Sequence, residues 1–271
     1  LTIKIYTRKY DRAFFHQLIS SQLDVDRLDY LNRDSFFTSV AEGVIGVDRI
    51  IKMMCVKNDQ IVFEKKGIYS IENFLIARRS MYWQVYLHKT VLVAEHILLK
   101  ILLRAKEVYR GGSDLFLTTP LRYFFDNEID LSRILKDVKV LEHFMSLDDH
   151  DVIACIKEWM SHEDTALAFL CRSIISRELL RIEISDTPIP EKYIQKVRTT
   201  FMKKLSLSPD VMENIVFTGA TTTQTYNSEE NVINILTKKE EIVDVIEASD
   251  QFNLTLLSRP VKKYYICYPK I

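Results

Sequence analysis

Residues 21–34 read SQLDVDRLDYLNRD and carry an unusual set of polar groups for an amphipathic helix. Four acids, two arginines and one tyrosine lie among buried-type leucines. On a helix with about 100° per residue, four of these side chains share an arc of roughly 100°: Asp26, Arg27, Tyr30 and Asp34. A solvated face needs neither a tyrosine between acids nor acids this dense among leucines. The stretch therefore predicts a helix that presents polar groups to a functional site.

The longest helical pattern in the chain follows this stretch and runs from about residue 70 to residue 110. Such a length exceeds that of an ordinary globular helix, so we expect a kink or a central buried helix. Residues 91–103 are apolar almost all the way round, which indicates burial. One arc of about 80° collects four polar side chains: Arg78, Tyr82, Tyr86 and Lys89. The same spacing also fits cations that extend from a helix surface over core tyrosines.

The remaining periodicities define the fold class, which is mostly α with a smaller α+β C-terminal part. We expect a helical domain over residues 1–179 and an α+β subdomain over residues 180–271. The further helices expected are 11–22, 47–54, 131–147, 149–160, 163–179 and 191–205. The strands expected are 60–66, 180–186, 214–218, 231–236 and 262–268, with a mobile loop over residues 219–230.

Composition excludes several classes of protein. The 271 residues have a formal net charge of zero, which disfavours nucleic acid and membrane surfaces as partners. The four cysteines lack CxxC spacing, so we expect reduced thiols in a cytoplasmic protein. The longest apolar run, residues 90–103, is interrupted by Glu95, His96 and Lys100 and is not expected to span a bilayer. No signal peptide is evident.

Other motifs favour structural readings. The string Asp148-Asp149-His150-Asp151 contains a His-Asp dipeptide, but acids at this position are typical of a helix start, with Asp149 as the expected cap. His16 is interpreted as a packed helix histidine rather than a metal ligand. The threonines at 221–223 are at best a weak phosphate-binding candidate. No Gly-rich phosphate loop, nucleophile elbow or dinucleotide fingerprint occurs in the sequence.

The run SQLDVDRLDYLNRD, followed some forty residues later by ARRSMYWQVYLHK (residues 77–89), resembles the HD-superfamily deoxynucleoside triphosphate triphosphohydrolases. That group includes bacterial dGTPases and the antiviral dNTPase of mammals. The resemblance covers residues 10–110 well and the rest loosely. It implies metal-dependent hydrolysis of (d)NTPs to nucleoside and triphosphate by a protein that forms homo-oligomers.

The resemblance also implies a role for each matching residue. Asp26 matches the distal carboxylate of the metal centre. Arg27 and Arg78 match residues that contact the triphosphate, and Tyr30, Asp34 and Tyr86 match residues around the deoxyribose. Leu87 replaces a glutamine that helps to read the nucleoside, so the base and sugar selectivity stay open.

The family's other metal ligands, a histidine and a His-Asp pair, precede the distal aspartate on separate helices, and residues 1–25 contain only His16. We therefore expect an incomplete chain that is inactive by itself. The implied cofactor is a divalent metal: Mn²⁺, Mg²⁺ or Fe²⁺, with Zn²⁺ or Ni²⁺ also possible. The alternatives are a non-catalytic nucleotide-binding or oligomerisation module, and a phosphohydrolase that acts on monophosphates or cyclic nucleotides.

Overall fold

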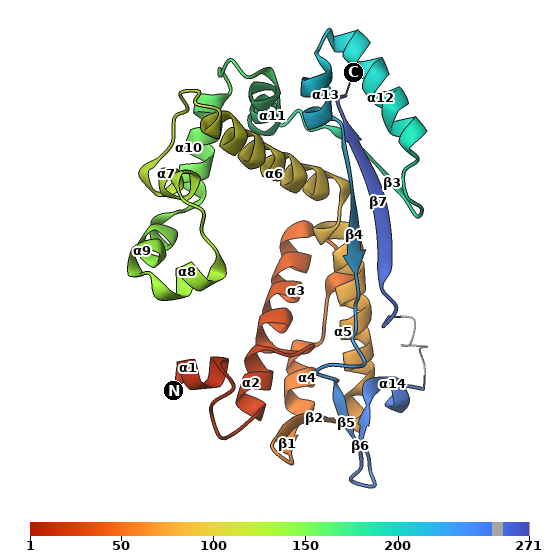
Figure 1. Cartoon of the computed structure of the whole chain (residues 1–271). Helices are drawn as coiled ribbons and strands as arrows, with labels where there is room; N and C mark the ends of the chain where they lie inside the picture. Colours follow the sequence, from red (N-terminus) through yellow and green to blue (C-terminus); the bar gives the residue numbers. More distant parts are fainter. Residues whose placement is uncertain (251–256, 271) are drawn as a thin grey trace. The chain divides into compact units, whose positions relative to one another are not determined.

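The computed structural model describes residues 1–250 and 257–270, and the chain divides into two compact units (Figure 1). The first unit combines residues 1–88 with 221–262, and the second combines residues 89–220 with 263–271. These units do not follow the division at residues 179 and 180 expected from the sequence. Each unit is completed by strand pairing between distant segments, which local periodicity does not reveal. The mostly α class with small sheets is confirmed.

The first unit places helices around a small mixed sheet. Its helices are α1 (Thr2–Tyr6), α2 (Phe14–Ile19), α3 (Val25–Thr38), α4 (Val47–Met53), α5 (Ile68–Met81) and α14 (Val245–Ala248). The sheet has the order β1 (Met54–Lys57), β2 (Gln60–Glu64), β5 (Asn234–Leu236) and β6 (Ile242–Asp244). The two outer pairs, β1–β2 and β5–β6, are antiparallel, while β2 and β5 are parallel. Residues 234–244 therefore belong to the sheet begun by residues 54–64.

A tight turn fixes the register of the first hairpin. Asn58 and Asp59 both have positive φ, 53° and 58°, which is the backbone of a two-residue turn between antiparallel strands. Lys57 pairs with Gln60 across this turn. The turn expected at Asn58-Asp59 is confirmed, and strand β1 before it was not expected from the sequence.

Close packing holds α3 beside α5, as Figure 1 shows. Gly43, which follows α3, has so little space that a Cβ there would lie 2.5 Å from the Sδ of Met81 and 2.9 Å from the Cβ of Ser35. Leu31 and Phe74 are fully buried in the same core. The polar residues of α3 and α5 are therefore carried by two helices whose spacing is fixed by packing.

The long helical pattern of residues 70–110 is broken, as expected. Helix α5 ends at Met81, and residues 82–86 form a π-helical turn, labelled η3, in which the Leu87 N–H donates to the Tyr82 carbonyl at 2.7 Å. Helix α6 (Lys89–Arg110) then starts in the second unit. The break is a widened turn rather than a proline or glycine kink.

The second unit packs helices on α6 and adds a three-stranded sheet. Its further helices are α7 (Thr119–Asp126), α8 (Leu131–Lys136), α9 (Val138–Ser146), α10 (Asp149–Trp159), α11 (Thr165–Ile175), α12 (Glu191–Leu205) and α13 (Pro209–Ile215). The sheet has the order β3 (Arg181–Ser185), β7 (Val261–Tyr268) and β4 (Phe217–Thr223). None of the helices in residues 1–250 and 257–270 is long and apolar enough to cross a membrane.

Three expectations for this unit need correction. Residues 131–147 form two helices, because the Asp137 carboxylate caps a new helix by accepting from the Lys139 N–H at 3.0 Å. The cap of α10 is Asp148 rather than Asp149. The strand expected at 214–218 begins only at Phe217, because Ser208 and Pro209 start helix α13 before it.

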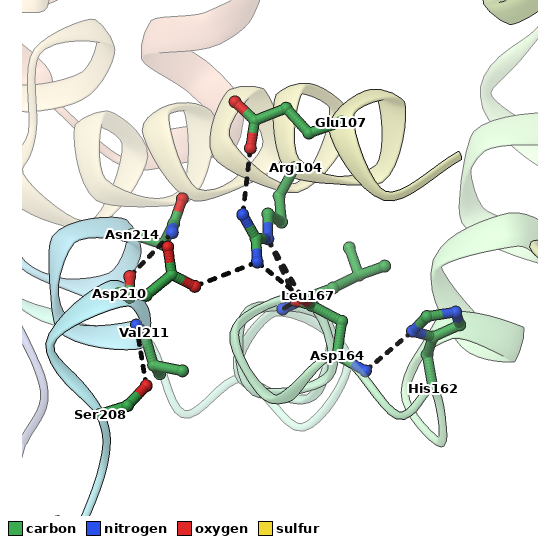
Figure 2. A network of polar contacts seen from close by, with 9 residues as sticks. All are labelled: Arg104, Glu107, His162, Asp164, Leu167, Ser208, Asp210, Val211 and Asn214. Atoms are coloured by element: carbon green, nitrogen blue, oxygen red, sulfur yellow. Dashed lines mark hydrogen bonds and ion pairs between the residues drawn. The ribbon is translucent and has the colours of Figure 1, made fainter. Parts of the chain in front are cut away.

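A charge network joins three helices of the second unit (Figure 2). The guanidinium of Arg104 on α6 donates to Asp164, the N-cap of α11, at 2.7 Å and to Asp210 on α13 at 3.2 Å. The side chains of Arg104 and Asp164 are only 18% and 17% exposed. Burial alone would raise the pKa of Asp164, but the hydrogen bonds from Arg104 and from the Leu167 N–H outweigh it and hold the pKa below its usual range.

We expect Arg104→Met to lower the free energy of unfolding by about 2–3 kcal/mol at neutral pH, because it leaves the Asp164 carboxylate buried without its partner. The pKa of Asp164 is lowered in the folded chain, so this contribution exists above the unfolded pKa of about 4 and fades as the pH falls below it. Urea titrations of the wild type and the variant, at neutral pH and below the unfolded pKa of Asp164, measure the difference in the free energy of unfolding. Arg110→Met, which removes an exposed pair with Glu128, should cost clearly less than Arg104→Met. Equal losses would contradict the assignment.

Candidate functional site

The N-terminus of α3 is organised by Asp24, which is only 2% exposed. Its carboxylate accepts from the Arg27 N–H at 2.9 Å and from the Ser21 N–H at 3.1 Å, which caps the helix. The same carboxylate also pairs with the guanidinium of Arg27. Asp24 therefore fixes both the start of α3 and the direction of the Arg27 side chain. The sequence expectations do not include this cap, although an aspartate just before an apolar helix is a recognisable cap signal.

Tyr86, in the turn that follows α5, joins α3 through a hydrogen bond. Its hydroxyl donates to the Asp34 carboxylate at 2.8 Å. The rings of Tyr30 and Tyr86 meet edge to face with centroids 5.9 Å apart, and Tyr82 contacts Tyr86 in the same manner at 5.4 Å. Burial and the bond to Asp34 together raise the pKa of Tyr86, so the phenol stays protonated. Three tyrosines thus line one polar cluster.

Arg78 is the most unusual member of this cluster, because its side chain is buried without an ionic partner among the described residues. It is 8% exposed, and its Nε and Nη1 atoms have no hydrogen-bond partner within the described part of the chain. Its guanidinium lies 5.7 Å from the ring centroid of Tyr82. The Nε of Arg27 is also buried and unpaired in that part of the chain. Two cations therefore keep donor atoms available inside the first unit.

The charges of Arg78 and Arg27 both influence the pKa of Tyr30. Burial raises the pKa of the Tyr30 phenol and Tyr82 adds to this, while the charges of Arg78 and Arg27 oppose the rise. Such opposition requires both guanidinium groups to lie near Tyr30. The structure therefore brings together five of the residues singled out in the sequence: Arg27, Tyr30, Asp34, Arg78 and Tyr86. Tyr82 belongs with them.

This arrangement suits an anionic ligand that also carries a hydroxyl group. Guanidinium N–H groups match phosphate oxygens in charge and geometry. Phenol rings offer flat apolar surface with a polar edge. The Asp34 carboxylate can accept only hydrogen bonds, so a ligand hydroxyl is its natural partner in addition to Tyr86.

Asp26 stands apart from the buried cluster. It lies in the first turn of α3 and is exposed. Across residues 1–250 and 257–270, no three His, Cys, Asp or Glu side chains group in a way that could hold a metal ion. The described residues therefore do not form a complete metal centre.

The helix start expected at residues 148–151 is confirmed, with Asp148 and Asp151 forming a reciprocal cap.

Lys89 completes the arc of polar groups expected on one helix, but it does not lie on the same helix as Arg78. The π-helical turn ends the helical phase of α5, and Lys89 opens α6 in the second unit. Because the helical phase changes at residues 82–86, the spacing of about 100° per residue that puts Lys89 on the arc with Arg78 does not apply across the turn.

Comparison with known proteins identifies the class. Residues 45–111 match the HD associated region, a segment that includes Arg78 and Tyr86. The chain is also similar to a solved phosphohydrolase from Bacteroides thetaiotaomicron, with 44% identity and a TM-score of 0.91 over 99% of this chain and 66% of that one. These findings support the HD phosphohydrolase superfamily.

Individual relatives extend this result. YwfO of Bacillus subtilis is 32% identical over 207 residues, which is 76% of this chain and 45% of that protein. The deoxynucleoside triphosphate triphosphohydrolase SAMHD1 homolog of Dictyostelium discoideum is 34% identical over 85 residues, 30% of this chain and 16% of that protein. The chain thus spans less than half the length of these two proteins.

We expect Tyr86→Phe to lower the free energy of unfolding by about 1–2 kcal/mol, because the Asp34 carboxylate loses a charged hydrogen bond in a half-buried position. Chemical denaturation at neutral pH measures this loss. Tyr82→Phe removes a hydroxyl from the same cluster and leaves the Tyr86–Asp34 bond in place, so it should cost less. A larger effect of Tyr82→Phe would show that the bond is not a stabilising element.

Proposed function

We propose that this chain carries the nucleotide-binding part of an HD phosphohydrolase that converts (d)NTPs to nucleoside and triphosphate. The observation that supports this most is the buried guanidinium of Arg78, with two unpaired donor atoms. An unpaired buried charge costs several kcal/mol, and a bound anion removes that cost. Arg27 supplies a second cation directed by Asp24. Together they form a clamp for phosphate oxygens.

In this proposal the sugar lies against the tyrosines. Tyr30 and Tyr86 meet at 5.9 Å and offer flat surface to a ring. Asp34, bonded to the Tyr86 hydroxyl, accepts a hydrogen bond from the 3′-hydroxyl. The pairing of phosphate donors with a sugar platform favours a nucleotide over a bare polyphosphate. The similarity of part of the chain to a deoxynucleoside triphosphate triphosphohydrolase points to the same ligand class.

Asp26 is proposed as the one carboxylate that this chain contributes to a divalent metal centre. The exposure of its side chain leaves it open to further ligands. Because the described residues do not complete such a centre, the other ligands would have to come from outside them. The chain's own contribution is therefore to bind and orient the nucleotide.

A second candidate function is a nucleotide-binding or oligomerisation module without catalysis. One observation favours it: helices α8 and α9 expose several large apolar side chains, which is typical of a surface that another molecule covers. They are Leu131, Leu135, Val138, Leu141, Phe144 and Met145. Homo-oligomerisation is compatible with both candidates and is part of the proposal.

The nucleotide assignment predicts an unusual pair of effects for Arg78→Met. The variant should be as stable as the wild type or more stable without ligand, because a buried charge is replaced by an apolar side chain of similar length. It should lose the stabilisation that dATP or dGTP gives the wild type, which is about 2.7 kcal/mol at a hundredfold excess over Kd. Thermal unfolding with and without nucleotide, in EDTA, measures both effects.

Arg33→Met is the matched control, because Arg33 pairs with Asp29 on the exposed side of α3, the helix that also carries Arg27. It should keep the full nucleotide response. If Arg78→Met responds to nucleotide as the wild type does, the clamp is not at this site.

The hydrolase assignment is tested in the full-length protein encoded by the gene, supplied with Mn²⁺ or Mg²⁺. We expect release of intact triphosphate from dNTPs. Asp26→Ala should lower turnover by about 100-fold or more while the nucleotide-dependent rise in melting temperature persists. Asp29→Ala, an exposed acid on the same helix, should leave turnover unchanged.

Retained turnover in Asp26→Ala would refute the metal role. Nucleotide binding without any turnover would favour the non-catalytic module. Hydrolysis of nucleoside monophosphates or cyclic nucleotides, with no triphosphate released from dNTPs, would indicate a phosphohydrolase of a different substrate.

A further inference from the structure

A groove of about 750 Å³ lies in the second unit and is lined by none of the residues of the candidate site. Helix α12 provides one wall, and residues of β3 and β7 with the segment after β7 provide the other. Four cations line it and no acid does: Arg181, Lys196, Lys204 and Lys270. Tyr193, Phe201 and Tyr268 supply aromatic rings between these charges. A basic groove with interleaved aromatic side chains is typical of surfaces that bind nucleic-acid strands.

The positive charge around the groove is concentrated on helix α12. Helix α12 holds five cations and a single acid, Glu191, in a chain whose formal net charge is zero. Lys196 and Lys204 are eight residues apart, so they share one helix face and lie about 12 Å apart along the axis. None of the ion pairs formed by the described residues involves either lysine. Two exposed ammonium groups therefore follow the groove.

The floor of the groove is aromatic. Tyr268 is 7% exposed, its ring lies 5.3 Å from that of Phe201, and the guanidinium of Arg181 lies 6.0 Å from it. Glu183 is the acid bonded to this floor. Its two carboxylate oxygens accept from the hydroxyls of Tyr268 and Tyr193, and the first of these bonds lowers its pKa. The carboxylate thus orients both phenols, while the Tyr193 ring keeps an exposed face.

We propose that this groove binds single-stranded nucleic acid, with the backbone along the cations of α12 and a base on Tyr193. A mononucleotide explains the groove less well, because Lys196 and Lys204, which line it, lie about 12 Å apart along the axis of α12. Exposed Lys192 and Lys203 add two more cations to the same helix. Cations spread along a helix suit successive phosphates of a strand better than those of one small ligand. The neutral net charge argued against a nucleic-acid partner, but it averages this basic helix with acids elsewhere. This function is additional to nucleotide hydrolysis.

The test is fluorescence anisotropy of a labelled oligothymidylate of about 12 nucleotides with the full chain at a series of KCl concentrations. The double variant Lys196→Glu/Lys204→Glu should weaken binding at least about tenfold near 50 mM KCl. The slope of log K against log salt should become about 1.4 shallower, because two phosphate contacts are lost. Tyr193→Leu should weaken binding about fivefold or more, and Tyr193→Phe should not.

The matched control is Lys238→Glu/Lys239→Glu, which makes the same charge change at two exposed lysines of the first unit. Near-native binding by this control supports the groove, whereas an equal loss in both double variants would overturn it. The proposal also fails if the wild type does not bind at about 100 µM protein in about 50 mM KCl. It fails too if unlabelled ATP competes as well as unlabelled oligothymidylate. Replacing thymidylate with oligouridylate shows whether RNA serves equally, and binding of either strand supports the proposal.

Discussion

The candidate site depends on one constraint: Arg78 is buried although its Nε and Nη1 atoms have no partner among residues 1–250 and 257–270. Arg78 is held in place because α5 packs closely on α3, with Gly43 leaving no space for a side chain between Met81 and Ser35. A flexible helix pair would let the cation turn toward solvent and avoid the cost of burial. Rigid packing instead keeps the charge where an anion can reach it. The packing of the apolar core therefore keeps the guanidinium of Arg78 in position for an anion. The cost of burying this charge lowers the free energy of unfolding of the ligand-free chain.

Much of this arrangement could be anticipated from two stretches of sequence. Helical spacing placed Arg27, Tyr30 and Asp34 on one face of α3, and Arg78 with Tyr86 on the following long pattern. The structure brings all five together. The 3.6-residue period holds for Arg27, Tyr30 and Asp34 within α3, whereas Tyr86 joins them from the π-helical turn. Asp24 was overlooked, since attention to the polar arc hid its simpler role as a helix cap. Lys89 was misplaced, because a π-helical turn carries no plain sequence signature.

Longer-range organisation lay beyond the reach of the sequence. The parallel pairing of β2 with β5 joins residues 62–64 to 234–236, and β3 pairs with β7 across some eighty residues. Neither the spacing nor the composition of one strand predicts which strand it pairs with. The chain therefore crosses between its two units three times, and both units are discontinuous. The basic face of α12 was missed for a related reason, since a whole-chain charge cannot report how charges are distributed.

The π-helical turn at residues 82–86 has a consequence for how this segment can vary. Such a turn is equivalent to one residue inserted into a regular helix, which advances every later position by about 100° around the axis. Tyr86 reaches Asp34 from within that insertion. A single-residue deletion there would restore an uninterrupted helix and rotate the tyrosine away from its acceptor. Related chains that have one residue fewer or more at this point should therefore differ in whether the hydrogen bond between the tyrosine and the aspartate can form.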